Sequence, residues 1–271
     1  MVESQNFYLT FRPTSPMSKN LLAFDDLLQE QRGYISKYPG NKKAVMVISG
    51  GLDSIATAAF LLEEKGMELF PLHIHRGQTN SVAEQKSVNF FTDFFQKKYG
   101  SDRFHDPMFI STNIPPKEFK ADLLPYTKKA GHPMRDPLIH LLGVEYAVAA
   151  SQTSKTNIKD VYCAIVPEDY FPHSTLAGLR ANTINACINM GDWQWQITSP
   201  NIDPHLTNGH FGKKEEIIWA MNHGIPIGRT ISCNEASGRT NDLACGTCSS
   251  CGRRRAAFQE AGCEDPTEYY A

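Results

Sequence analysis

Residues 45–66, VMVISGGLDSIATAAFLLEEKG, decide the fold of this chain. The stretch begins with an apolar run typical of a buried strand and ends with an alanine-rich segment typical of a helix. Between them lies SGGLDS, residues 49–54. Gly50 and Gly51 allow backbone N–H groups to approach an anion closely, and the following helix adds the positive end of its dipole. We therefore expect a phosphate-binding turn between a strand and a helix.

The same alternation of strand and helix continues along the chain. Expected strands cover 42–49, 68–75, 106–112, 160–166 and 193–200, and expected helices cover 54–66, 82–100, 137–151, 181–190 and 213–224. Alternating strands and helices form parallel β-α-β units, so the sequence predicts an α/β fold with a doubly wound parallel sheet. Ligands of such sheets bind at the carboxyl ends of the strands, where residues 49–54 fall.

The composition excludes several classes of protein. The chain has 271 residues, of which 41% are hydrophobic and 21% are charged, and its net charge is −2. These values are typical of a globular protein with a hydrophobic core, and the charge does not indicate a nucleic-acid-binding protein. No apolar stretch approaches the roughly 20 residues that cross a membrane, and the start lacks the features of a secretory signal. We therefore expect a cytoplasmic protein that does not bind membranes.

Asp53 adds a metal requirement to the predicted phosphate site. A carboxylate repels phosphates unless a cation lies between them, so Asp53 predicts Mg²⁺ bound together with the phosphates. The sequence fits neither GxxxxGK[ST] nor GxGxxG, which argues against an ordinary P-loop or dinucleotide site. SGGLDS instead resembles the PP-loop of the ATP pyrophosphatases, enzymes with a Rossmann-like fold that cleave ATP between its α and β phosphates.

This resemblance implies two groups of ATP-binding residues. The pyrophosphate end of ATP would be held by Ser49, Gly50, Gly51, Leu52, Asp53 and Ser54. Adenine would lie against backbone atoms at the end of the second strand, at His73 and Ile74. The side chains of His73 and His75 are expected to pack rather than to act in catalysis.

Four cysteines near the end of the chain form a second motif. The pattern C-x11-C-x2-C-x2-C is formed by Cys233, Cys245, Cys248 and Cys251. Four thiolates suit a tetrahedral Zn²⁺ with no open position, so we expect one structural zinc ion per chain in a C-terminal zinc knuckle. A redox pair would leave two of these cysteines unexplained, and an iron–sulfur cluster would need an electron-transfer context that the sequence does not supply.

These motifs predict three regions. Residues 1–40 form an N-terminal extension with a lead-in helix at 21–35 that packs on the main domain. Residues 41–230 form the ATP-binding α/β domain, and residues 231–271 form the zinc-binding region.

The two motifs together resemble those of the 7-cyano-7-deazaguanine synthases, the QueC family. The resemblance begins at about residue 44 and is strongest in GKKEEIIWAMNHGIPIGRTISC (212–233), CGTCSSCGRRRAAFQEAG (245–262) and EDPTEY (264–269). It implies that ATP adenylates the carboxylate of 7-carboxy-7-deazaguanine and that ammonia displaces AMP to give an amide. A second activation would then convert the amide to a nitrile. The family also implies a homodimer.

The resemblance assigns roles to individual residues. Arg135 and Lys214 would neutralise negative charge that develops on the phosphates, beside Asp53 as the third catalytic residue. The deazaguanine contacts would be Asp169, Tyr170 and Arg180, in the stretch DYFPHSTLAGLR (169–180). This stretch departs from the GYPDCR segment of the family, and Asp136 stands where the family usually has asparagine.

Three alternatives remain open at the level of sequence. The enzyme could stop at the amide or transfer the activated deazaguanine carboxylate to another amine. A PP-loop enzyme that thiolates tRNA would share the fold, although the negative charge of this chain disfavours it. A zinc-binding nucleotide module without catalysis would need a degenerate PP-loop, whereas SGGLDS is intact.

Overall fold

A computed structural model describes residues 16–169, 171, 174–207 and 211–270 of the chain. The strands are β1 (Lys43–Val47), β2 (Glu68–His75), β3 (Met108–Ser111), β4 (Asp160–Tyr162) and β5 (Gln196–Thr198). The α-helices are α1 (Pro16–Arg32), α2 (Leu52–Glu63), α3 (Ser81–Tyr99), α4 (Lys120–Ala130), α5 (Arg135–Ser154), α6 (Leu176–Met190), α7 (Lys213–Asn222) and α8 (Ser249–Ala261). Short 3-10 turns occupy η2 (Lys117–Phe119), η3 (Ile227–Arg229) and η4 (Gly238–Thr240).

The five strands form one parallel sheet in the order β3-β2-β1-β4-β5. Val47 of β1 lies opposite Leu72 of β2, and Val45 lies opposite Val161 of β4. The chain adds strands on one side of β1 and then on the other, so the direction of winding reverses at β1. This arrangement confirms the predicted doubly wound sheet and places the carboxyl end of β1 at the switch point, where such folds bind ligands.

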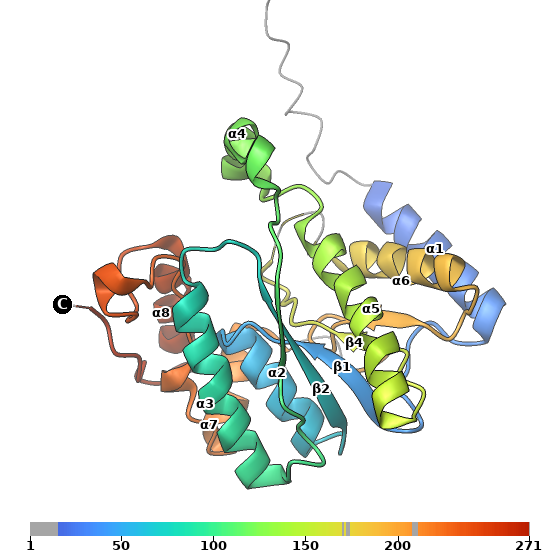
Figure 1. Ribbon diagram of the computed structural model, residues 1–271, viewed down its shortest axis with the longest axis horizontal. Helices are drawn as coiled ribbons and strands as arrows, with labels where there is room; N and C mark the ends of the chain where they lie inside the picture. The colour runs from blue at the N-terminus through green and yellow to red at the C-terminus, as the bar shows by residue number, and fades with distance from the viewer. Residues whose placement is uncertain (1–15, 170, 172–173, 208–210, 271) are drawn as a thin grey trace, which may run out of the picture.

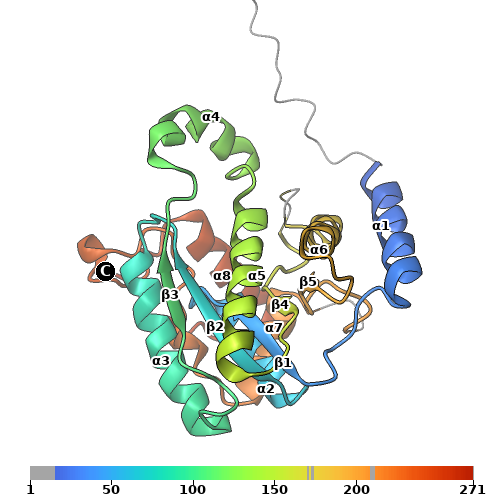
Figure 2. The ribbon, with the colours of Figure 1, turned by 45° about the vertical axis from the view of Figure 1, so that its right-hand side comes forward.

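Helices cover both faces of the sheet, and Figures 1 and 2 show α2, α3, α7 and α8 on the face opposite to α5 and α6. The alternation of side chains along β1 explains the two layers. Ala44 and Met46 belong to a hydrophobic core with residues of α2, α3, α7 and α8. Val45 belongs to a second core with residues of α5 and α6. Both cores are apolar because parallel strands are buried on both faces.

The predicted strands and helices are confirmed, with differences in length. β4 and β5 are shorter than the predicted 160–166 and 193–200, and the expected lead-in helix forms as α1, which packs against α6. Sequence patterns predict no helix between 112 and 137, where the structure has η2 and α4. Figures 1 and 2 show α4 standing away from the sheet, beyond the N-terminal end of α5. None of the described helices is long and apolar enough to cross a membrane.

Candidate active site

The SGGLDS loop connects β1 to α2 at the carboxyl end of the central strand. Gly50 has a φ of 76°, a conformation that favours glycine. A Cβ atom at Gly50 would lie 2.8 Å from the carbonyl oxygen of Glu84 and 2.9 Å from Cβ of Ser87, so no larger residue fits. The Gly50 carbonyl accepts hydrogen bonds from Oγ of Ser87 (2.8 Å) and from N–H of Ile231 (2.9 Å). The turn is therefore held from behind by α3 and by the segment after α7.

The front of the loop offers hydrogen-bond donors to an anion. The hydroxyl groups of Ser49 and Ser54 lie 3.1 Å apart, and N–H of Gly51 donates to Oγ of Ser49. Helix α2 starts directly after Gly51, and no side chain in the described part of the chain caps it. The first N–H groups of an α-helix have no partner inside the helix. The loop and the first turn of α2 can therefore bind phosphate oxygens.

Asp53 forms an ion pair with Lys213, the first residue of α7. Nζ of Lys213 lies 2.6 and 2.5 Å from the two carboxylate oxygens of Asp53. Burial lowers the pKa of Lys213, but the negative charge of Asp53 is the largest opposing cause, and the pKa of Lys213 is raised overall. Lys213 therefore stays protonated and keeps a positive charge at the start of α2.

The sequence assigned the catalytic lysine to Lys214, but the structure places its neighbour at the loop. The side chain of Lys214 is exposed, whereas that of Lys213 is 14% exposed and contacts Asp53. Successive helix residues point about 100° apart around the axis. Lys213 is therefore the lysine of this pair that lies at the SGGLDS loop, and a catalytic role for either lysine remains a prediction.

Glu216 lies buried beneath the Asp53–Lys213 pair, on the same helix as Lys213. Its side chain is fully buried, and Nδ2 of Asn201 donates to one carboxyl oxygen at 2.9 Å. The other oxygen, Oε2, has no hydrogen-bond partner among the described residues. Burial and the nearby charge of Asp53 raise the pKa of Glu216 well above its ordinary value. Burial therefore favours the protonated form of Glu216 beside the Asp53–Lys213 pair.

The loop opens into a cavity of about 340 Å³ between α2, the N-terminal end of α5 and the start of α8. Arg135 lines this cavity, and its Nε donates to Oδ1 of Asp136 at 2.6 Å. Oγ of Ser174 donates to the other Asp136 oxygen at 2.6 Å. Burial lowers the pKa of Arg135, but the carboxylate of Asp136 outweighs it and raises this pKa. Asp136 therefore orients a charged guanidinium toward the cavity.

Asp169, a predicted substrate contact, also lines the cavity. N–H of Val166 donates to Oδ2 of Asp169 at 3.3 Å. Burial and the negative charge of Asp53 raise the pKa of Asp169 above its ordinary value. Phe171 also lines the cavity, whereas Tyr170 lies outside the described residues. The contact of Asp169 with a substrate remains a prediction.

Arg180 does not reach the cavity, in contrast to the predicted substrate contact. Its side chain is 1% exposed, and both Nη atoms donate to the carboxylate of Asp203, at 2.8 and 3.0 Å. Its Nε donates to Asp25 of α1 at 2.8 Å. The guanidinium therefore ties α6 to α1 and to the segment after β5. Its four hydrogen bonds go to interior groups of Asp25, Ser36 and Asp203, so the geometry favours a structural role for Arg180.

His73 and Ile74 lie on the part of β2 that pairs with β3. His73 is buried, and its Nδ1 lies 2.9 Å from the carbonyl oxygen of Ile48, to which it donates. Burial lowers the pKa of His73 to about 4, so the ring is neutral and packs as expected. Neither residue lines the cavity, and the placement of adenine against this strand remains a prediction.

The cavity also contains residues that sequence reasoning missed. The cavity-lining charged residues without a predicted role are Arg76, Glu84, Asp136, Lys213, Arg253 and Arg254. Arg76 could have been found from its position directly after β2, because ligand-binding residues of parallel sheets follow the strand ends. The others lie on helices, and their sequence neighbourhood carries no such signal.

The four predicted metal ligands come together in the C-terminal region. Their sulfur atoms all lie within 4.8 Å of one another. Sγ of Cys248 lies 3.5 Å from Sγ of Cys251 and 3.9 Å from Sγ of Cys233. Four sulfurs about 2.3 Å from a tetrahedral ion lie about 3.8 Å apart, so the spacing fits a single metal ion. These distances are far longer than the S–S bond of a disulfide.

Backbone N–H groups also point at two of these sulfurs. N–H of Cys245 and N–H of Glu235 donate to Sγ of Cys233, at 3.2 and 3.3 Å, and N–H of Thr247 and N–H of Cys248 donate to Sγ of Cys245, both at 3.4 Å. Such N–H···S bonds stabilise thiolates, the form in which cysteine binds metal. Helix α8 begins directly after Cys248 and carries Arg254, which donates to Thr230 at 2.8 Å. The cysteine group therefore fixes the start of α8 beside the active-site cavity.

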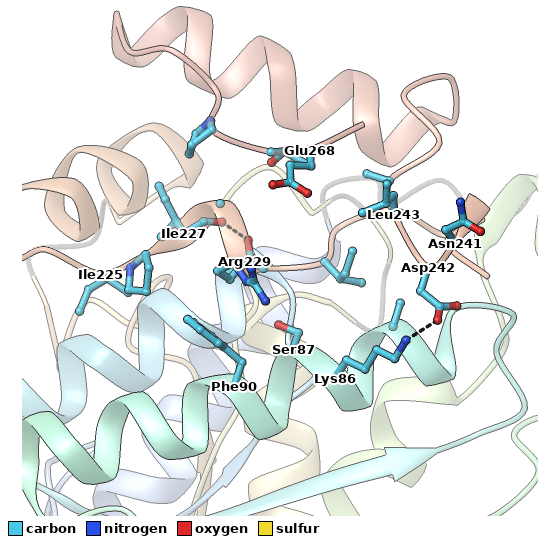
Figure 3. Close-up of a pocket in the computed structure, with 18 of the residues that line it drawn as sticks. Lys86, Ser87, Phe90, Ile225, Ile227, Arg229, Asn241, Asp242, Leu243 and Glu268 are labelled. Carbon is cyan, nitrogen blue, oxygen red and sulfur yellow. Dashed lines mark hydrogen bonds and ion pairs between the residues drawn. The ribbon is translucent and has the colours of Figure 1, made fainter. Parts of the chain in front are cut away.

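A larger cavity of about 630 Å³ lies between α3, the segment after α7 and the C-terminal segment. Figure 3 shows Ser87 and Phe90 of α3 below it, and Arg229, Leu243 and Glu268 around it. Ile231 lines both cavities, and Ser87 holds the Gly50 carbonyl. None of the predicted site residues lines this second cavity. The chemistry of the site therefore belongs to the smaller cavity.

The sheet is doubly wound, SGGLDS lies at its switch point, and four cysteines that could hold a metal ion lie near the C-terminus. These features define a PP-loop nucleotide-binding protein. A sequence model described as "Queuosine biosynthesis protein QueC" matches residues 135–262. A 7-cyano-7-deazaguanine synthase of Campylobacter fetus subsp. fetus is 30% identical over 240 residues, covering 84% of this chain and 97% of that protein. The synthase of Nautilia profundicola is 28% identical over 242 residues, covering 84% of this chain and 98% of that protein. The chain belongs to the QueC family of 7-cyano-7-deazaguanine synthases, which are ATP-dependent enzymes that form carbon–nitrogen bonds.

Solved structures match less closely. The U34-tRNA thiolase NcsA from Methanococcus maripaludis is 14% identical, with a TM-score of 0.38 over 91% of this chain and 80% of that chain. The NMN synthetase from Francisella tularensis is 13% identical, with a TM-score of 0.36 over 91% and 93%. Scores this low support no conclusion about this chain.

Proposed function

We propose that the protein uses ATP to adenylate the carboxylate of 7-carboxy-7-deazaguanine and joins the activated carbon to ammonia, with 7-cyano-7-deazaguanine as the end product. The observation that carries this proposal is the intact SGGLDS loop, which shares one cavity with Lys213 and Arg135. A carboxylate is a poor electrophile, and adenylation makes AMP its leaving group. Membership of the QueC family supports the choice of substrate.

The proposed reaction activates the substrate twice, first at the carboxylate and then at the amide. A carboxylate oxygen attacks the α-phosphorus of ATP, and the bond to pyrophosphate breaks. Ammonia then attacks the acyl carbon, AMP leaves, and a proton from nitrogen is released. In a second round the amide oxygen attacks another α-phosphorus, pyrophosphate leaves, and the loss of AMP and two protons gives the nitrile.

The side chains around the loop have distinct tasks in this scheme. N–H groups of the loop and of the first turn of α2 bind the pyrophosphate part. Lys213 and Arg135 neutralise negative charge that develops on the phosphates, without having to reorganise. Asp53 would hold Mg²⁺, since its carboxylate lies at the loop and is 28% exposed to the cavity side. Bound Mg²⁺ would withdraw charge from the phosphate oxygens.

The four-cysteine group would hold one structural Zn²⁺. Its four thiolates leave no open position for a substrate, which argues for a structural rather than a catalytic ion. The family resemblance further supports a homodimer in the cytoplasm and the three regions 1–40, 41–230 and 231–271. These points remain predictions.

A second candidate keeps the adenylation and changes the nucleophile. Arg180, a predicted deazaguanine contact, is buried against Asp203 and does not line the cavity. The acceptor side of the cavity therefore differs from the expectation drawn from the family. An enzyme that stops at the amide, or joins the deazaguanine carboxylate to another amine, would use the same ATP site.

Mass spectrometry of the products decides between these candidates. The protein is incubated with Mg²⁺, ATP, 7-carboxy-7-deazaguanine and ammonia, and the nucleotide products are separated by chromatography. The proposal expects AMP, pyrophosphate and the nitrile. The amide alone, or a product formed only with another amine, would establish the second candidate. ADP in place of AMP would refute adenylation.

A further inference from the structure

Arg76 is a cation of the active-site cavity for which the described residues offer no partner. It follows the last residue of β2 directly, and its half-buried side chain lines the cavity. Its guanidinium forms no hydrogen bond or ion pair with any residue in the described part of the chain. Its backbone N–H donates to the side chain of Gln78. A guanidinium carries five N–H donors, all of which remain available here.

The other cations of the cavity are already engaged. Lys213 is paired with Asp53, and Arg135 donates to Asp136. Arg254 is buried and donates to the hydroxyl of Thr230 and to a carbonyl oxygen. Arg253 is exposed at the rim. Arg76 is therefore the half-buried guanidinium of the cavity that has no hydrogen bond or ion pair to a described residue, whereas Arg135 is held by Asp136.

The surroundings of Arg76 leave room for an anion. Burial lowers the pKa of Arg76, and the positive charge of Arg135 lowers it further, while Asp136, which raises it, already accepts hydrogen bonds from Arg135 and Ser174. Glu84 opposes this effect, but Gln78 and Asn80 already donate to its two oxygens, at 2.6 and 3.0 Å. A partly desolvated cation without an ion-pair partner is unfavourable until an anion binds. The site thus favours a ligand with negative charge.

The topology indicates which part of the nucleotide this anion is. β1 and β2 are adjacent parallel strands, so the residues after them lie side by side at the carboxyl edge of the sheet. The loop after β1 offers the pyrophosphate site, and Arg76 follows β2. Arg135 approaches from α5, close enough that its charge acts on Arg76. We propose that Arg76 and Arg135 flank the α-phosphoryl group of ATP, and that Arg76 binds it as a catalytic residue.

This inference rests on ATP as the co-substrate and adds a contact to the transferred adenylyl group. The α-phosphorus is the atom attacked by the carboxylate, and negative charge increases on its oxygens during attack. The planar fork of a guanidinium can donate to two of these oxygens at once. Arg76 would therefore bind the adenylyl group rather than the leaving pyrophosphate.

Binding measurements with two probes test this assignment. The probes are α,β-methylene-ATP with Mg²⁺, which contains the α-phosphoryl group, and pyrophosphate with Mg²⁺, which does not. Isothermal titration calorimetry compares the wild type with Arg76→Gln and Arg76→Lys. Arg239→Gln is the matched control, because Arg239 is exposed and lies outside the cavity.

We expect Arg76→Gln to weaken binding of α,β-methylene-ATP about 10-fold or more, since a charge-assisted hydrogen bond is lost. Pyrophosphate affinity should stay within about twofold of the control. Arg76→Lys should recover part of the loss, because it keeps the charge but not the fork. The melting temperature of the ligand-free protein should not fall, because the guanidinium has no partner among the described residues and its partial burial is unfavourable without an anion.

Several outcomes would overturn the assignment. Equal affinity of Arg76→Gln and Arg239→Gln for α,β-methylene-ATP would show that Arg76 does not touch the nucleotide. An equal loss for both probes would place Arg76 at the leaving group. A marked fall in melting temperature in both Arg76 variants would indicate a structural role. A wild type that binds pyrophosphate but no ATP analogue would refute the proposed function itself.

Discussion

Two adjacent lysines at the start of α7 provide the sharpest test of the site. Lys213→Gln removes the cation that contacts Asp53, whereas Lys214→Gln removes an exposed cation of the same type one residue away. The two substitutions change net charge equally. Any difference between the variants therefore reports on the position of the side chain.

The geometry sets the expected loss of stability. Nζ of Lys213 lies 2.5 and 2.6 Å from the carboxylate oxygens of Asp53, and the two side chains are 14% and 28% exposed. A hydrogen bond to a charged group contributes about 1.5–3 kcal/mol, and partial solvent exposure reduces this to about 1–2 kcal/mol. For a chain of this length that loss corresponds to a fall in Tm of about 2–8 °C. Lys214→Gln should stay within about 0.5 kcal/mol of the wild type.

The effect on adenylation should be larger than the effect on folding. Removing one preorganised donor from a site of developing negative charge lowers kcat about 100- to 1000-fold. The rate of AMP formation is measured by chromatography with saturating ATP and 7-carboxy-7-deazaguanine, and the folded fraction by thermal unfolding. Lys214→Gln should keep a rate within about twofold of the wild type.

Two results would refute this reasoning. Equal rates for the two variants would mean that Lys213 has only a structural role. A large loss in Lys214→Gln with a normal Lys213→Gln would restore the assignment made from the sequence, and would require α7 to turn when ATP binds.

Three further predictions follow from individual contacts. Cys248→Ser should lose the zinc ion and much of the stability, because the binding energy of a structural metal contributes to folding. The control variant Cys263→Ser should retain the metal. Elemental analysis measures the metal content of both variants, and iron in the wild type would contradict the zinc prediction. Burial raises the pKa of Glu216, so its favourable contribution is complete at low pH and is lost as the pH rises above the ordinary value of about 4.5 toward the folded-state pKa. Thermal unfolding of Glu216→Gln across this range should show a smaller decline in Tm than the wild type, and parallel curves would contradict the raised pKa. Arg180→Met should cost about 3–5 kcal/mol in the free energy of unfolding, because it leaves the fully buried carboxylate of Asp203 unpaired. Activity per folded molecule should be unchanged, and a selective rise in KM for the deazaguanine would restore Arg180 to the substrate site.

Local patterns determined much of the architecture. The apolar run before SGGLDS and the alanine-rich segment after it predicted β1, the phosphate-binding turn and α2, because each signal lies within a few residues. Most of the other strands and helices were predicted for the same reason. The spacing of Cys245, Cys248 and Cys251 also acts locally, since a short knuckle turns successive thiolates toward one point.

The sequence was less informative where a helix had no periodic apolar face. No sequence pattern predicted α4, which stands away from the sheet and therefore packs little against the core. Helical signals in a sequence reflect the face that is buried. A helix outside the main layers therefore leaves a weak signal.

Only the tertiary structure decided which charged residues belong to the site. Lys213 rather than Lys214 meets Asp53, because the rotation of α7 about its axis is set by packing of Ile217 and Ala220 against α2 and its neighbours. Arg180 turns inward because α1 and the segment after β5 bring Asp25 and Asp203 to it. These partners lie far apart in the sequence, and no local pattern records which faces meet.

The position of Arg76 likewise depends partly on local sequence and partly on tertiary structure. Its place after β2 is a local property, but its access to the cavity depends on α5 and the SGGLDS loop, which come from other parts of the chain. The sequence by itself thus determined the fold class, the phosphate-binding turn and the cysteine group, because short-range spacing and periodicity specify them. The tertiary structure decided which cations face that turn, because a charge acts on its spatial neighbours and not on its neighbours in sequence.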